Sequence, residues 1–196
     1  AIISICRFSG ERWDRTVEGQ ADLTGLYKVD KKCLARAAEV FEHGDFYLSD
    51  AESKLVEQVT ANFAKVIVVL NVGGVVDTTW FAKNDKIQAA LFAWQAGMEG
   101  GLAIADILCG DANPSGKLVD TFAEKLSDYP FSDSFHESHT YVDYKEDIYV
   151  GYRYFETIPG KSEKVVYPFG YGLSYTTFVI EETDSYIENN SLHVSI

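Results

Sequence analysis

The chain has 196 residues, of which 46% are apolar and 24% are charged, and its formal net charge is −13. This is the composition of an ordinary globular domain with enough apolar side chains to build a core. An acidic surface repels phosphate backbones, so we expect no nucleic acid partner. No apolar run approaches the roughly 18 residues that a membrane-spanning helix needs, so we expect no membrane partner either.

The cysteines are Cys6, Cys33 and Cys109, an odd number with wide spacing and no CxxC pair. This pattern predicts free thiols, mostly buried, and it favours a reducing compartment such as the bacterial cytoplasm. The chain starts at Ala1, inside an apolar run. We therefore expect a fragment or a processed product of a longer protein.

Apolar runs and helical periodicity predict an alternation of strands and helices up to residue 122. Ser49 and Glu52 form a capping box that opens one helix, and the β-branched run KVIVVL is typical of a strand covered on both faces. The helix from Leu102 has the apolar content of a buried one. The predicted strands cover 1–6, 65–70, 87–94 and 117–122, and the predicted helices cover 32–42, 49–63, 78–82 and 102–108.

This order predicts an α/β fold, a mainly parallel sheet flanked by helices in a three-layer α/β/α sandwich. Right-handed crossovers place the loops that follow parallel strands at one edge of the sheet. We therefore expect Glu11, Asn71–Gly74 and Gln95–Gly101 near one another, at the edge where open α/β sheets bind ligands. A long, mostly irregular segment follows from Leu126 to Gly172.

The tail from Thr177 predicts two strands around a turn at Asn189-Asn190, too short to fold alone. We expect it to begin a further β-domain.

Glu11 is the leading candidate for chemistry, because it lies in a glycine-bearing loop directly after the first predicted strand. A carboxyl group beside Trp13 can have a raised pKa and act as a general acid/base. Arg12 and Arg15 favour the charged form instead. A simple surface pair between arginine and Glu11 is the alternative, and spacing alone does not exclude it.

Other candidates have ordinary explanations. His136 and His139 are spaced too closely for an HExxH zinc motif, which favours a solvated loop. The glycines of Gln95–Gly101 could present amides to an anion or merely permit a tight turn. The tryptophans and tyrosines could stack on sugar rings, although packing explains most of them. Phosphate-binding glycine loops and a GxSxG elbow are missing from the sequence.

Several stretches together resemble the C-terminal α/β-sandwich domain of glycoside hydrolase family 3, the β-glucosidase family. The resemblance extends from residue 2 to 178 and departs from the family pattern at Arg12, where glycine is usual, and in a long Thr16–Gly44 segment. The stretches are SGERWDR (9–15), DFYLSDAE (45–52), WQAGMEGGLAIADILCGDANPSGKL (94–118), DIYVGYRYFE (147–156) and YPFGYGLSYTTF (167–178).

The resemblance implies a retaining exo-β-glycosidase, β-glucosidase-like, that uses two carboxylates and no metal or cofactor. Its general acid/base corresponds to Glu11, with Arg12 and Trp13 as substrate-binding residues. The loop would be supported by Ser9, Gly10, Asp14 and Arg15. The nucleophile would be an aspartate on a (β/α)8 barrel domain of the same enzyme, which this sequence does not contain, so the chain alone would be inactive. The substrate would be a β-glucoside or an oligosaccharide.

By the same resemblance, residues 1–178 are the sandwich domain without its first strands. Residues 179–196 would begin a β-sandwich of the fibronectin III type. Two alternatives stay open from the sequence: a non-catalytic carbohydrate-binding or docking domain, and a flavodoxin-like ligand-binding domain that lacks its phosphate loop.

Overall fold

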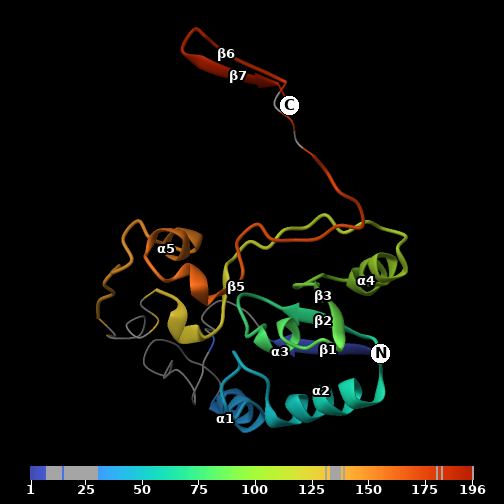
Figure 1. Cartoon of the computed structure of the whole chain (residues 1–196). Coiled ribbons are helices and arrows are strands. Elements are labelled where there is room, and N and C mark those ends of the chain that lie inside the picture. The colour runs from blue at the N-terminus through green and yellow to red at the C-terminus, as the bar shows by residue number, and fades with distance from the viewer. Residues whose placement is uncertain are drawn as a thin grey trace.

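The computed structural model describes residues 1–7, 15, 31–130, 132, 138, 140–179, 181 and 183–195. Its centre is a parallel sheet of β1 (Ile2–Arg7), β2 (Val66–Val72) and β3 (Ile87–Phe92) in the order β1-β2-β3 (Figure 1). Each pair is parallel, so all these strands end at one edge. This confirms the predicted α/β class with a mainly parallel sheet, and the strands at 1–6, 65–70 and 87–94 are shifted by only one or two residues.

The core lies around β2, the central strand. Val66, Val68, Leu70 and Val72 are almost completely buried, as the unbroken β-branched run predicts for a covered strand. Ile3 and Ile5 of β1 join them in the same cluster, together with Val76, Phe81 and Phe122 from later segments. Fully burying a side chain of this kind stabilises a fold by about 1.5–3 kcal/mol, so this cluster fixes how β1 and β2 are placed.

Helix α2 (Asp50–Asn62) lies along β1 and contributes buried Val56 to the core (Figure 1). Its first turn has the predicted capping box. The Glu52 amide donates to Ser49 Oγ at 3.3 Å, and the Ser49 amide donates to Glu52 Oε2 at 2.9 Å. These contacts satisfy backbone donors that the first turn would leave unpaired, which is why the helix begins here.

Two further helices were also predicted, and they appear as α1 (Lys31–Val40) and α3 (Thr79–Ala82). None of the helices in the described part of the chain combines the length and the apolar character that crossing a membrane requires.

Helix α4 (Gly100–Cys109) forms where a helix was expected, but the prediction that it is buried is wrong. Only Gly100 is buried, and Leu102 is 65% exposed. Figure 1 shows the reason: α4 lies beyond the β3 edge and is not stacked on a face of the sheet. Apolar composition alone does not say which surface a helix covers.

The predicted strand at 117–122 is also wrong in its extent and pairing. The strand that forms is β4 (Phe122–Ala123), which pairs antiparallel with β5 (Val165–Tyr167) outside the parallel sheet. Leu118 is instead bonded to the later chain, since its amide donates to the Tyr171 carbonyl and its carbonyl accepts from the Gly170 amide. Long-range pairing of this kind leaves no local signal in the sequence.

The stretch predicted as mostly irregular contains more structure than expected. The helix missed by sequence reasoning is α5 (Tyr152–Thr157), which buries Phe155. Short 3-10 turns follow β4 and precede β5 in the chain: η2 (Leu126–Asp128) and η3 (Ser162–Lys164).

The tail forms a hairpin of β6 (Asp184–Glu188) and β7 (Ser191–Ser195). Asn189 and Asn190 both have positive φ, at 49° and 63°, which is the conformation that a tight hairpin turn needs. The predicted strands and turn are therefore confirmed. Whether this hairpin begins a β-sandwich stays a prediction.

The cysteines differ from the prediction that they are mostly buried. Cys6 and Cys109 are free, as expected, but both are exposed. Cys6 points away from the core because alternate residues of β1 face opposite sides, and Ile3, Ile5 and Arg7 are the buried ones. The side chain of Cys33 lies outside the described residues.

Candidate functional site

The expected site lies at the carboxyl edge of the sheet, where β1 ends at Arg7 and β2 ends at Val72. Of the predicted site residues, the structure describes Arg15. It places Arg15 against the loop that follows β2; the predicted proximity of Glu11 to this loop stays a prediction. The others lie outside the described residues: Ser9, Gly10, Glu11, Arg12, Trp13 and Asp14.

Arg7, the last residue of β1, is buried and was not predicted to matter. Its guanidinium forms a two-point ion pair with Glu52, with Nη1–Oε1 at 2.7 Å and Nη2–Oε2 at 2.6 Å. It also donates to main-chain carbonyls of Cys6, Asp45 and Tyr47 at 2.8–2.9 Å. All its N–H donors thus have acceptors, which is the condition for burying a charge.

Glu52 therefore has two partners, the backbone of Ser49 and the charge of Arg7. Burial works to raise the pKa of Glu52, but the hydrogen bonds from Arg7 and Ser49 and the positive charge of Arg7 outweigh it and lower the pKa. The carboxylate stays charged at neutral pH. The pair fixes the end of β1 against the start of α2.

Arg15 has an equally buried partner. Its Nη1 lies 2.7 Å from Asp45 Oδ2, and the two side chains are 7% and 8% exposed. The same guanidinium donates to the carbonyls of Gly73 and Val75 in the loop after β2. Arg15 is thereby held to the carboxyl edge of the sheet.

Asp45 connects the two arginines. Its main-chain carbonyl accepts from Arg7 Nε at 2.9 Å, and its carboxylate pairs with Arg15. No sequence pattern assigns a role to Asp45, although this residue opens the DFYLSDAE stretch of the family resemblance. Its partners are 38 and 30 residues away, which no local pattern reveals.

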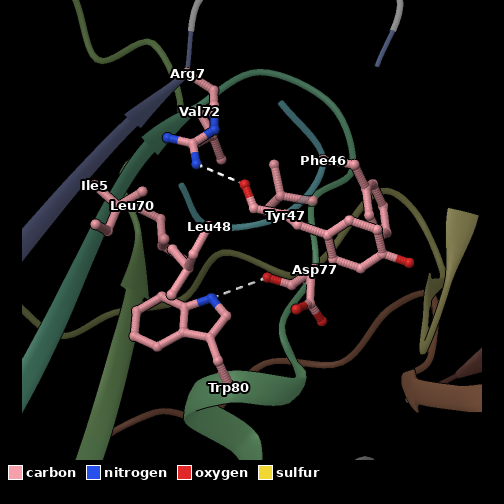
Figure 2. A pocket seen from close by; sticks show the side chains of 10 residues that line it. Ile5, Arg7, Phe46, Tyr47, Leu48, Leu70, Val72, Asp77 and Trp80 are labelled. Carbon is pink, nitrogen blue, oxygen red and sulfur yellow. Dashed lines mark hydrogen bonds between the residues drawn. The ribbon is translucent and has the colours of Figure 1, made fainter. Parts of the chain in front are cut away.

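A small cavity of about 10 Å³ lies beside Arg7, with Tyr47, Asp77 and Trp80 in its wall (Figure 2). That is room for about one water molecule, so a sugar ring does not fit. Asp77 serves the fold here, since its Oδ1 accepts from the Thr79 amide at 2.8 Å and its carbonyl accepts from Trp80 Nε1 at 3.1 Å. Burial raises the pKa of Asp77, although hydrogen bonds from the Thr79 amide and from the Thr79 hydroxyl, at 2.6 Å, act to lower it.

The Gln95–Gly101 loop fits the tight-turn alternative. Gly97 has a φ of +73°, which suits glycine, and a Cβ on Gly100 would lie 2.6 Å from that of Ala96. Backbone conformation at Gly97 and lack of space for a side chain at Gly100 therefore explain these two glycines. Trp94 packs against Phe92 and Phe122, with ring centroids 5.2 and 6.4 Å away, so core packing accounts for this aromatic residue.

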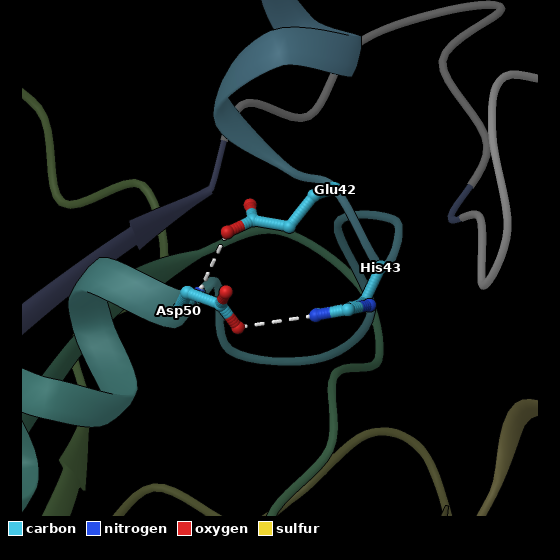
Figure 3. A group of neighbouring side chains, drawn as sticks. All are labelled: Glu42, His43 and Asp50. Carbon is cyan, nitrogen blue, oxygen red and sulfur yellow. Dashed lines mark hydrogen bonds and ion pairs between the residues drawn. The ribbon is translucent and has the colours of Figure 1, made fainter.

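Glu42, His43 and Asp50 form an exposed group at the start of α2 (Figure 3). Glu42 Oε1 accepts from the Asp50 amide at 3.0 Å, and His43 Nε2 lies 3.1 Å from Asp50 Oδ1. Carboxylates are stabilising at a helix N-terminus, so helix capping accounts for the group. His136 and His139, weighed above as zinc ligands, lie outside the described residues.

Comparison with known proteins gives a consistent result. Residues 15–175 match the glycosyl hydrolase family 3 C-terminal domain. Beta-glucosidase A of Butyrivibrio fibrisolvens is 63% identical over 183 residues, which make up 93% of this chain and 22% of that protein. An exo-α-(1→6)-L-arabinopyranosidase of Bifidobacterium longum is 40% identical over 143 residues, covering 73% of this chain and 18% of that protein.

Among solved structures, β-glucosidase 3B from Thermotoga neapolitana in complex with glucose matches with a TM-score of 0.71 and 39% identity. The match covers 95% of this chain and 23% of that one. The chain thus spans only about a fifth of the length of the relatives it resembles.

Proposed function

Since this chain belongs to glycosyl hydrolase family 3 and carries that family's C-terminal domain, we propose that it supplies the general acid/base of a retaining exo-β-glycosidase. Glu11 is the proposed residue. The observation that carries the assignment is the SGERWDR stretch, which begins two residues after β1 and ends at Arg15, at the carboxyl edge of a parallel sheet. Open α/β sheets bind their ligands at this edge.

In the proposed mechanism Glu11 acts twice. As an acid it protonates the glycosidic oxygen while an aspartate nucleophile attacks the anomeric carbon, which releases the alcohol and leaves a glycosyl-enzyme ester. As a base it then takes a proton from water, and the hydroxyl oxygen displaces the aspartate with net retention. The nucleophile belongs to a (β/α)8 barrel domain of the same enzyme.

The proposed substrate is a terminal β-D-glucoside or a related β-glycoside of an oligosaccharide. Relatives with matching C-terminal domains are named for glucosides and for an arabinopyranoside. We therefore assign the choice of sugar mainly to the barrel. Arg12 and Trp13 are proposed to contact substrate beside Glu11, while Ser9, Gly10, Asp14 and Arg15 shape their loop.

A test of the Glu11 assignment compares leaving groups in the enzyme that contains this domain. Glu11→Ala should slow substrates with poor leaving groups by about 100-fold or more, and dinitrophenyl glycosides far less, because only the former need protonation. Glu57→Ala, an exposed change on α2, is the control. Equal losses for both substrate classes would remove Glu11 from the role.

The proposal also predicts that the 196-residue chain alone does not hydrolyse an aryl β-glucoside. Without a nucleophile no glycosyl-enzyme intermediate can form. Measurable turnover by the purified chain that is lost in its Glu11→Ala variant, and so does not come from a contaminating enzyme, would contradict the division of the site between two domains.

A further inference from the structure

Both ends of the segment 8–14 are fixed by buried arginines. The chain enters this segment from Arg7 and leaves it at Arg15, and the 45–52 stretch binds both guanidinium groups. Arg7 is tied to Glu52 and the Asp45 carbonyl, while Arg15 is tied to the Asp45 carboxylate and to Gly73 and Val75. The residues that border segment 8–14, Arg7 and Arg15, are thus both held at the carboxyl edge of the sheet.

The side chain of Asp45 is separate from the capping of α2. The helix is capped by Ser49 and Glu52. The Asp45 carboxylate is aimed at Arg15 instead, and at 8% exposure it is as buried as its partner. A buried carboxylate is costly unless it is paired, and the Arg15 guanidinium at 2.7 Å supplies the opposite charge.

We propose that Asp45 is a positioning residue for the general acid/base, acting through Arg15. This inference rests on the proposed role of Glu11. A general acid must lie within hydrogen-bond reach of the oxygen that it protonates, and a displacement of about 1 Å can cost about 100-fold in rate. Asp45 and the loop after β2 hold Arg15, the residue four positions after Glu11 in the sequence, at the carboxyl edge of the sheet.

The test uses Asp45→Asn in the enzyme that contains this domain. This change removes the charge opposite Arg15 but keeps the side-chain volume and the main-chain carbonyl that Arg7 uses. We expect kcat/KM for substrates with poor leaving groups to fall by about 10- to 100-fold, with a much smaller loss for dinitrophenyl glycosides. Arg15→Lys keeps the charge without the forked donors. It should also lower kcat/KM selectively for substrates with poor leaving groups, but by a smaller factor.

Controls separate positioning from simple destabilisation. Glu57→Gln removes an exposed carboxylate from α2 and should leave both substrates unchanged. If Asp45→Asn and Arg15→Lys reduce both substrate classes by the same factor, or if neither changes the rate, the inference is wrong.

Glu11→Gln is measured beside them. If Glu11→Gln is selective for poor leaving groups and the Asp45 and Arg15 variants are not, only this inference fails. If Glu11→Gln is itself not selective, the proposed function fails and the inference falls with it.

Discussion

Arg7 and Glu52 form a two-point ion pair that joins the last residue of β1 to the first turn of α2. The same carboxylate completes the capping box by accepting from the Ser49 amide. The Arg7 side chain also donates to the carbonyls of Asp45 and Tyr47, so it connects β1 both to the start of α2 and to the 45–47 stretch.

Replacing Glu52 should destabilise the domain strongly. Glu52→Ala leaves Arg7, whose side chain is 2% exposed, without its carboxylate and removes half of the capping box. Removing one partner of a buried ion pair costs about 3–5 kcal/mol. We expect a loss at the lower end, since the Glu52 side chain is 21% exposed. Urea unfolding monitored by circular dichroism measures it, with Glu57→Ala as the exposed control on the same helix. A loss no greater than the control's would contradict this account of the pair.

The same pair should make stability depend on pH. The pKa of Glu52 is lowered below its ordinary value of 4.5 in the folded chain, so the unfolded state binds more protons in that range. The stability that Glu52 contributes is fully present above about pH 4.5 and is lost as the pH falls through the lower folded value. Wild type should therefore lose stability more steeply on acidification than Glu52→Gln does. Parallel slopes in the two proteins would show that another carboxylate is responsible.

A different part of the fold depends on Gly172. A Cβ added there would lie 2.5 Å from the Gly116 carbonyl oxygen and 2.9 Å from Lys117 Cδ. Gly172→Ala should therefore push the 170–175 stretch away from 116–118 and destabilise the chain by about 1–3 kcal/mol. Gly116→Ala is a matched control, because its Cβ would meet nothing within 4 Å. Thermal unfolding of both variants tests this, and equal melting temperatures would contradict the close approach.

Local signals predicted the elements whose causes are local. Residues close together in the sequence determine three of these elements: the β-branched run of β2, the Ser49–Glu52 capping box and the Asn189-Asn190 turn. Partners far along the chain could not be predicted in this way. Nothing near Leu118 indicates pairing with Tyr171, and nothing within α4 indicates that it would lie beyond the sheet.

The candidate site could likewise be predicted only in part. Sheet topology predicted that the loop after β1, with Glu11, would lie near the loop after β2, because parallel strands bring their carboxyl ends to one edge. Arg15, the residue of that loop that the structure describes, contacts the loop after β2. The roles of Arg7 and Asp45 could not be predicted, because they depend on contacts between residues far apart in the sequence. Arg7 lies 38 positions from Asp45 and 45 from Glu52, and Arg15 lies 30 positions from Asp45. The acid/base role of Glu11 came from the family resemblance, and Glu11 itself lies outside the described residues.

Added azide distinguishes the proposed acid/base role of Glu11 from a role as the nucleophile. In Glu11→Ala of the enzyme that contains this domain, a dinitrophenyl β-glucoside should still form the glycosyl-enzyme, and azide should then attack from the β face. We predict that added azide raises the rate and yields the β-glycosyl azide, identified by proton NMR. An α-glycosyl azide would mean that Glu11 is the nucleophile, and no azide product at all would contradict an acid/base role for Glu11.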